Sequence, residues 1–223
     1  MATMSAKQTI AIIGATGNMG AAIARSLSKG KNRLLLFSHN QDKSQQLAHD
    51  IKNSHTSADV ESIECKVNAS WEADIIILAV PYGAEKEIAA QIRDVANQKI
   101  VISIANPLNE TYKKMVTPTD TSAAEELQKL LPNSKVVKAF NTIFAADFAN
   151  PVIDGKQVDS FIAGNDAEAV DTVTELVKTA GFNAIVAGEL PASRTLEHMM
   201  LLLIQLTMKH NYNWLAGWKI LHN

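Results

Sequence analysis

Three glycines spaced three residues apart, directly after a short apolar run, constrain this chain most strongly. The run is Thr9–Ile13, and the glycines are Gly14, Gly17 and Gly20. An apolar, β-branched run of this length predicts a buried parallel strand, and residues 21–27 continue with helical periodicity. In such a strand–turn–helix unit the first glycine permits the tight turn, the second lets the backbone approach a pyrophosphate, and the third lets the helix pack closely. Because the amides at the helix start can hold an anion, the motif predicts a dinucleotide-binding corner.

The rest of the chain alternates short apolar segments with stretches of helical period. Further strands are expected at residues 33–37, 62–67, 73–80, 99–104, 135–139, 159–163 and 183–187, and further helices at 41–52, 84–96, 122–131 and 167–179. This alternation predicts an α/β fold with a doubly wound, Rossmann-type parallel sheet. We expect a single domain over residues 1–223, in which residues 190–223 form a short helical C-terminal segment that packs on the sheet or makes an interface.

Composition narrows the kinds of partner. The formal net charge is −2 and no basic run stands out, so nucleic acid is not an expected partner. Cys65 is the only cysteine, which excludes an internal disulfide and suits a reducing cytosol. None of the histidines stands at a zinc-ligand spacing with cysteine or glutamate, so no metal site is expected.

Two segments bear on membrane association. Residues 1–7 lack the apolar core of a signal peptide. The most apolar stretch, residues 196–208, is interrupted by Glu197, His198 and Gln205 and is too short to span a bilayer. We interpret it as a buried or interface helix whose methionines suit a core or a dimer face. We expect a cytoplasmic protein that has no membrane partner and can form a homodimer.

The residues after the second predicted strand bear on which dinucleotide would bind. NAD-binding folds usually place an acidic residue there, which binds the ribose 2′-hydroxyl. This chain instead has Ser38, His39 and Asn40, with Lys43 just beyond. These side chains can donate hydrogen bonds or supply positive charge to a 2′-phosphate, so NADP is favoured over NAD. The alternative is that Ser38 or Asn40 is an ordinary helix cap.

Asparagines follow two later strands of the predicted sheet. Asn106–Pro107 comes after the fifth strand and Asn141–Thr142 after the sixth. Open α/β sheets bind ligands at the carboxyl ends of their strands, so these amides can fix a carboxamide or a ring carbonyl. The alternative is that they are common turn residues with no further role.

Taken together, segments along the chain resemble the NADPH-dependent coenzyme F420 reductase family. The resemblance covers nearly the whole chain and is most specific in Gly-Asn-Met-Gly and Ala-Phe-Asn-Thr. It implies a Rossmann fold and hydride transfer between NADP and a deazaflavin. The segments that carry it are residues 12–20, 38–39, 79–81, 135–143, 148–150, 187–197 and 218–221.

The family's nicotinamide and phosphate contacts would fall on one subset of residues. By resemblance they are Thr16, Gly17, Asn18, Met19, Ser38, His39, Lys43, Val80 and Ala139. The full set of cofactor-binding residues that we expect is Gly14, Ala15, Thr16, Gly17, Asn18, Met19, Ser38, His39, Asn40, Lys43, Ala79, Val80, Pro81, Tyr82, Asn106, Pro107, Ala139 and Asn141. No catalytic acid, base or metal ligand is among them, because hydride transfer between two stacked rings needs positioning rather than proton transfer.

Two departures from the family pattern leave the electron partner open. Where His39 stands, the family often has arginine. Residues 103–108 and the pair Phe140–Asn141 differ from the archaeal deazaflavin-binding members and look more like bacterial relatives. The related cytosolic domains of six-transmembrane ferric reductases pass hydride to a flavin, so the expected acceptors are coenzyme F420 or FMN/FAD.

Two other readings stay open. Gly-Ala-Thr-Gly also opens many short-chain dehydrogenases, some of which are NADP-binding redox sensors, and Tyr82 and Lys86 spell their Tyr-x-x-x-Lys pair. Here the pair follows the fourth strand directly, which favours coincidence, with Tyr82 lining the nicotinamide end of the site. Imine-type reductases share Gly-Asn-Met and Ala-Val-Pro, but their long helical dimerisation domain exceeds the tail of this chain.

Overall fold

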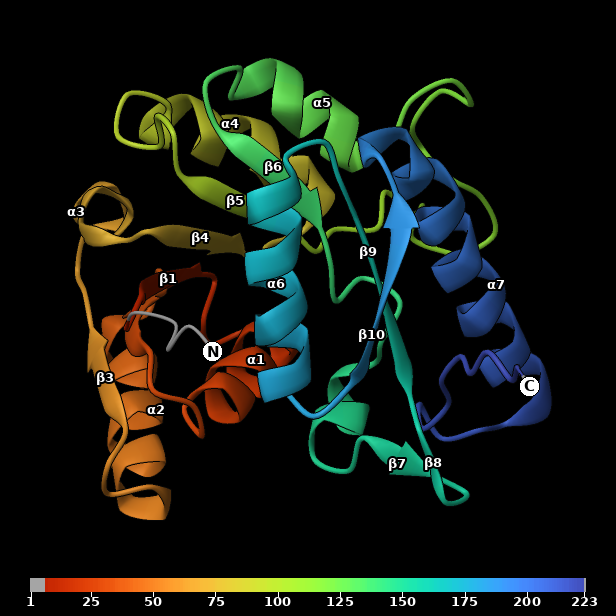
Figure 1. The fold of residues 1–223 in the computed structure, drawn as a ribbon, viewed down its shortest axis with the longest axis horizontal. Helices are drawn as coiled ribbons and strands as arrows, with labels where there is room; N and C mark the ends of the chain where they lie inside the picture. The colour runs from red at the N-terminus through yellow and green to blue at the C-terminus, as the bar shows by residue number, and fades with distance from the viewer. Residues whose placement is uncertain (1–6, 223) are drawn as a thin grey trace, which may run out of the picture.

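The computed structural model describes residues 7–222 and shows one large sheet with helices on both faces (Figure 1). Residues 1–6, on which most of the signal-peptide expectation rests, lie outside this range. The sheet has eight strands in the order β10-β9-β6-β5-β4-β1-β2-β3. Its strands are β1 (Thr9–Ile13), β2 (Arg33–Phe37), β3 (Asp59–Ser62), β4 (Ile75–Leu78), β5 (Ile100–Ser103), β6 (Lys135–Lys138), β9 (Asp159–Gly164) and β10 (Asn183–Gly188).

Helices alternate with the strands along most of the chain. The α-helices are α1 (Asn18–Leu27), α2 (Gln41–Ser54), α3 (Lys66–Glu72), α4 (Tyr82–Ile92), α5 (Ala123–Leu130), α6 (Ala167–Thr179) and α7 (Ser193–His210). Two 3₁₀ turns, η1 (Ala145–Phe148) and η2 (Leu190–Ala192), and a small hairpin of β7 (Val152–Ile153) and β8 (Lys156–Gln157) complete the list. Ser122 caps α5 by accepting a hydrogen bond from the amide of Glu125, as its capping-box sequence predicts.

The first six strands form the doubly wound sheet that the sequence predicts. Strands β1 to β6 pair in parallel, and the chain winds outward in both directions from the contact between β1 and β4. All four residues of β4 are buried, as expected for a central parallel strand covered on both faces. The boundary between β1 and β4 is therefore the topological switch point, where open α/β sheets bind ligands.

Two local expectations were wrong. The sheet is not uniformly parallel, since β9 pairs antiparallel with β6. The reason is that residues 139–158 contain only a 3₁₀ turn and a hairpin, whereas a parallel return needs a long crossover, usually a helix. The strand expected at residues 62–67 ends at Ser62, because β3 pairs with β2 only from Asp59 to Ser62, and α3 begins at Lys66.

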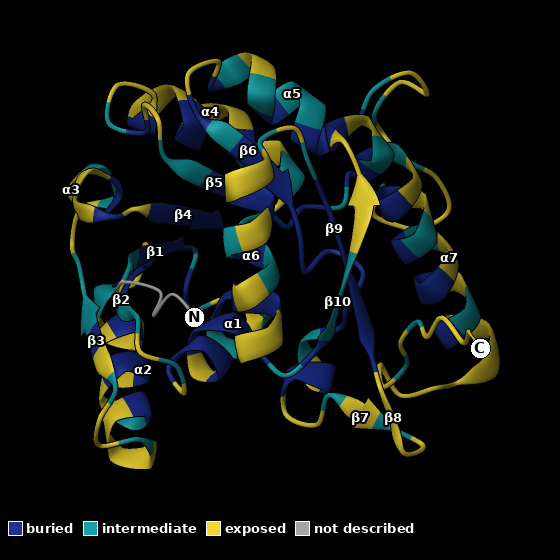
Figure 2. Cartoon of the chain, viewed as in Figure 1, coloured by how far each residue is buried: buried dark blue, intermediate teal, exposed yellow. Residues whose placement is uncertain are grey.

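The apolar core is divided by the sheet into two layers. On one face of the sheet, the strand side chains pack against α1, α2 and α6. On the other face, they pack against α3, α4 and α5. In Figure 2 the central strands β1 and β4 are buried, while exposed residues gather on the outer faces of α2 and α6.

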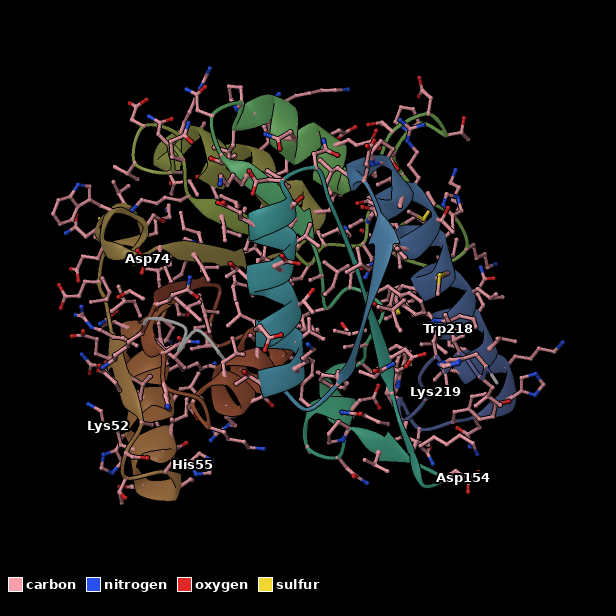
Figure 3. All side chains as sticks on the ribbon, viewed as in Figure 1. Lys52, His55, Asp74, Asp154, Trp218 and Lys219 are labelled. Carbon is pink, nitrogen blue, oxygen red and sulfur yellow. The ribbon has the colours of Figure 1, made fainter. Side chains whose placement is uncertain are left out.

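Helix α7 and the residues after it close the far side of the molecule. Its buried side chains Met200, Leu203 and Ile204 pack with Phe144, which confirms the expected buried helix. After α7 the chain returns to β9, where the carbonyl of Trp218 accepts a hydrogen bond from the amide of Asp159 (Figure 3). Within residues 7–222, no helix combines the length and the apolarity needed to cross a membrane.

Candidate cofactor site

The turn after β1 lies against the end of β4 at the switch point. Gly14 has φ = 89°, and its amide and that of Ala15 both donate to the carbonyl of Phe37 at 2.9 Å. A Cβ atom at Gly14 would lie 2.3 Å from the carbonyl oxygen of Ala79 and 2.9 Å from a methyl group of Val80. Only glycine permits this conformation and this close approach. The structure thus brings Gly14, Ala15, Ala79 and Val80 together, as predicted.

The other two glycines of the motif differ in what surrounds them. A Cβ atom at Gly20 would lie 2.3 Å from the carbonyl oxygen of Gly14, so Gly20 is required for the packing of α1 on the turn. A Cβ atom at Gly17 would meet nothing closer than the Gly14 oxygen at 3.4 Å, and Gly17 is exposed. The protein itself therefore does not require a glycine at position 17, which leaves the space in front of it for a ligand.

Two helices begin at the switch point without a side-chain cap. Gly17 precedes α1 and Pro81 precedes α4, and the first amides of neither helix donate to a capping side chain. Helices α3 and α7 are also uncapped, whereas α2, α5 and α6 are capped by Asn40, Ser122 and Asp166. The first amides of a helix have no partner within the helix and carry the positive end of its dipole. The predicted residues Thr16–Met19 and Pro81 thus surround a position suited to an anion.

The residues after β2 form a polar corner next to the glycine turn. The hydroxyl oxygens of Thr16 and Ser38 lie 2.6 Å apart. The Ser38 hydroxyl also accepts a hydrogen bond from the amide of Asn40, whose own side chain caps α2 at the Lys43 amide. The interpretation of Asn40 as a helix cap is therefore confirmed. His39, Asn40 and Lys43 are exposed, so they remain accessible from the cofactor side.

One basic residue beside this corner was not expected from the sequence. The ammonium of Lys66, at the start of α3, lies 5.4 Å from the centroid of the Phe37 ring. The same ring meets the His39 imidazole edge-on, with centroids 5.7 Å apart. The prediction of a strand over residues 62–67 concealed this placement, and no local signal pointed to it.

The carboxyl ends of β5 and β6 are joined by their asparagines. The Asn106 amide donates to the carbonyl of Asn141 at 2.9 Å, and the Asn141 amide donates to the side-chain oxygen of Asn106 at 3.0 Å and to the carbonyl of Leu196 at 3.2 Å. Phe140, between Ala139 and Asn141, has φ = 59°, a conformation that is uncommon for a bulky residue. The side-chain oxygen of Asn141 is buried without a hydrogen-bond partner. Such unpaired acceptors are rare in cores.

Tyr82 is engaged by the neighbouring helix. Its hydroxyl donates to a carboxylate oxygen of Glu126 on α5 at 2.5 Å. Burial and the Glu126 carboxylate raise the pKa of Tyr82 above the usual value for a tyrosine. Tyr82, Lys86 and Glu126 line a cavity of about 430 Å³ beside α4 and α5. A tyrosine held in this way is a poor proton donor at neutral pH.

A buried ionic network behind the strand ends was not predicted. The Lys138 ammonium lies 2.6 Å from the Glu197 carboxylate and 2.5 Å from the carbonyl oxygen of Ala105. The second oxygen of Glu197 accepts from the Ala123 amide at 3.2 Å. Nearby, Glu85 accepts from the Ser103 hydroxyl, and burial raises the pKa of Glu85 to about 7 against the opposing effect of Lys138. This network links the ends of β5 and β6 to α5 and α7.

The fold and the site define a class of protein. A glycine turn at the switch point, the uncapped starts of α1 and α4 and the absence of a carboxylate from residues 38–41 are typical of a Rossmann-type protein that binds a dinucleotide. The sequence model of a family described as "NADP oxidoreductase coenzyme F420-dependent" matches residues 9–107. This match covers less than half of the chain, but an F420-dependent NADP reductase is 34% identical to the chain over 90% of its length. The chain therefore belongs to this family and is an NADP-dependent oxidoreductase.

Individual relatives support this assignment. The chain is 34% identical over 213 residues to an F420-dependent NADP reductase of Methanocaldococcus jannaschii, covering 90% of this chain and 93% of that protein. It is 36% identical over 107 residues to metalloreductase STEAP3 of Rattus norvegicus, which is 48% of this chain and 21% of that protein. A solved structure from Arthrobacter sp. FB24, described as an F420-dependent NADP reductase, has the same fold with a TM-score of 0.82, 23% identity, and coverage of 96% of this chain and 100% of that one.

Proposed function

We propose that this protein transfers hydride between NADP(H) and a deazaflavin of the coenzyme F420 type, with FMN or FAD as the other acceptor to be tested. The observation that carries the proposal is the open space in front of Gly17. Gly14 and Gly20 are required by their own surroundings, whereas nothing in the protein requires a glycine at position 17. A bound pyrophosphate accounts for the glycine at position 17.

The residues around this cradle fit the parts of NADP. The first turn of α1, from Thr16 to Met19, would bind the pyrophosphate through backbone amides. Ser38, His39 and Lys43 would bind the 2′-phosphate, since residues 38–41 directly after β2 carry no acidic side chain to repel it. The first carboxylate, that of Asp42, lies in the first turn of α2. Asn40 caps α2 and would position this corner.

The nicotinamide end would lie over the carboxyl ends of β4, β5 and β6. Val80 and Pro81 offer apolar surface there, whereas Ala139 is fully buried. Asn106 and Asn141 supply amide groups whose mutual hydrogen bonds hold both strand ends in register. Tyr82 would border this end through its ring, since its hydroxyl is bound to Glu126. Pro107, which is buried, fixes the turn after β5.

The two cofactors supply the redox chemistry when bound, one as hydride donor and one as acceptor. The protein's part is to bring both rings to one place and to exclude water. Its uncapped helix starts bind the phosphates, and the asparagine pair orients the ring-binding edge. The proton that completes the reduction of the acceptor would come from solvent, so no side chain has to take up or give up a proton at the strand ends.

We also propose that two copies of the chain associate through the C-terminal segment, residues 190–223, which completes a single domain with the sheet. Large apolar side chains are exposed on this segment, and a monomer rarely leaves so many uncovered in one region. They are Leu202, Met208, Tyr212, Trp214, Leu215, Ile220 and Leu221. Sedimentation equilibrium should give the mass of two chains, and a single-chain mass at micromolar concentration would contradict the dimer. The exposed free thiol of Cys65 suits a reducing compartment, so we infer a cytoplasmic location.

The acceptor is identified by following NADPH oxidation against a panel. The panel comprises a deazaflavin, FMN, FAD and several imines, with a control that contains no acceptor. The proposal predicts turnover with the deazaflavin and a slower or absent reaction with imines. Turnover of an imine alone, or of no tricyclic ring, would contradict it.

A further inference from the structure

Lys66 is brought to the cofactor corner by the boundary between β3 and α3. Strand β3 ends at Ser62, and Lys66 is the first residue of α3. Its ammonium lies 5.4 Å from the centroid of Phe37, the last residue of β2. The His39 ring lies against that same aromatic ring, at 5.7 Å. A permanent cation and an imidazole therefore share one aromatic platform at the end of β2.

The ammonium of Lys66 is not neutralised by a neighbouring carboxylate. Within residues 7–222, the ion pairs involve other cations, such as Lys7 with Asp59 and Lys135 with Asp166, and none involves Lys66. The side chain is only half-buried, and a lysine swings on a flexible four-carbon stem. It can therefore leave the Phe37 face for an anion nearby at little cost.

We propose that Lys66 is a specificity-determining residue that binds the 2′-phosphate of NADP together with Ser38 and His39. This inference rests on the proposed function, since it assigns a residue to the 2′-phosphate position of that same site. A lysine binds phosphate as a point charge, so it does not need the fork geometry of an arginine. Lys66 would thereby supply a positive charge beside the side chains of Ser38 and His39.

The test is a titration of NADPH and of NADH, followed by fluorescence, into the wild type and three variants. Lys66→Gln removes the charge, Lys66→Arg keeps it, and Lys52→Gln is the matched control near the opposite end of α2 from Asn40 (Figure 3). Lys66→Gln should weaken NADPH binding by about 10- to 100-fold and leave NADH binding within about twofold. Lys66→Arg should retain most of the NADPH preference, and Lys52→Gln should change neither affinity.

Each other result decides against the proposal. Equal loss of NADPH and NADH affinity in Lys66→Gln would mean that the Phe37 contact only supports the fold, and unchanged NADPH affinity would mean that Lys66 does not reach the phosphate. Both leave the proposed function standing, because the wild type would still prefer NADPH. A wild type with no NADPH preference would overturn this inference and the NADP assignment of the proposed function together.

Discussion

The ammonium of Lys138 lies 2.6 Å from the carboxylate of Glu197, and both side chains are fully buried. The pair joins the end of β6 to the second turn of α7. Through the carbonyl of Ala105 and the amide of Ala123 it also reaches the end of β5 and the start of α5. This one ion pair thus connects four elements around the proposed nicotinamide end, and we expect it to position the strand ends.

Breaking this pair should be strongly destabilising. Lys138→Met leaves the Glu197 carboxylate buried without its partner, which typically costs about 3–5 kcal/mol of unfolding free energy. Lys135 lies on the same strand as Lys138 and forms a partly exposed ion pair with Asp166, the N-cap of α6. Lys135→Met should cost no more than about 1 kcal/mol. Denaturant unfolding of both variants measures the difference. If the two variants were equally stable, the buried pair would have no special role.

A double replacement checks the origin of that cost. Lys138→Met combined with Glu197→Leu removes both charges, so no unpaired charge remains in the core. Such replacements are often neutral, and the double variant should recover most of the stability that Lys138→Met loses. The orientation of Asn106 and Asn141 should then be less defined, which would appear as lower kcat with little change in NADPH affinity.

Stability should fall as pH rises from about 4.5 to about 7. Burial raises the pKa of Glu85 to about 7 from a usual value of 4.5 and that of Asp147 to about 6 from 3.8. In this range the folded protein holds protons that the unfolded chain has already released, so deprotonation favours unfolding. Glu85→Gln keeps the acceptor for Ser103 and should flatten the profile, gaining up to about 3 kcal/mol above pH 7.

The control for this pH effect lies on the same helix. Glu87 is exposed on α4, so Glu87→Gln should leave the pH profile of the unfolding free energy unchanged. The interpretation fails if Glu85→Gln and wild type show parallel profiles between pH 4.5 and pH 8.

Substitutions at Gly17 and Gly20 should differ in phenotype. Gly17→Val should fold with nearly wild-type stability and lose NADPH binding, because its side chain would occupy the space in front of α1. Gly20→Ala should lose about 1–3 kcal/mol of unfolding free energy, because its Cβ would lie 2.3 Å from the Gly14 carbonyl oxygen. Thermal unfolding and NADPH titration of both variants test this. A Gly17→Val protein that binds NADPH normally would remove the main support for the cradle.

Tyr82→Phe should retain most of the activity. The hydroxyl that is lost is bonded to Glu126 and not to a substrate position, and the ring remains. General acid catalysis typically contributes about 10²–10⁴-fold. A loss of that size in single-turnover hydride transfer would instead identify Tyr82 as a proton donor and favour the short-chain-dehydrogenase reading.

The local sequence pattern predicted most of the strands and helices. It did not predict the direction of each strand in the sheet or the contacts between residues far apart in the chain. The glycine spacing and the apolar run of β4 identified the switch point, because each feature follows from neighbouring residues. The apolar pattern of β9 predicts a strand equally well in either direction, and only the short connection after β6 makes it antiparallel. Lys138 and Glu197 lie 59 residues apart, and a lysine in a strand or a glutamate in an apolar helix gives no sign of its partner. Lys66 was missed because a β-branched neighbour, Val67, extended the strand pattern into α3.

The most direct test of the proposed function follows the transferred hydride from NADPH to the deazaflavin. NADPH carrying deuterium at both C4 positions is mixed with the enzyme and an oxidised deazaflavin in unlabelled water, and the reduced deazaflavin is analysed by mass spectrometry. The account predicts one carbon-bound deuterium per reduced deazaflavin, formed at the rate at which NADPH is consumed, because the ring system receives the hydride directly. Consumption of NADPH without reduction of the deazaflavin, or a reduced deazaflavin that carries only hydrogen from water, would contradict it.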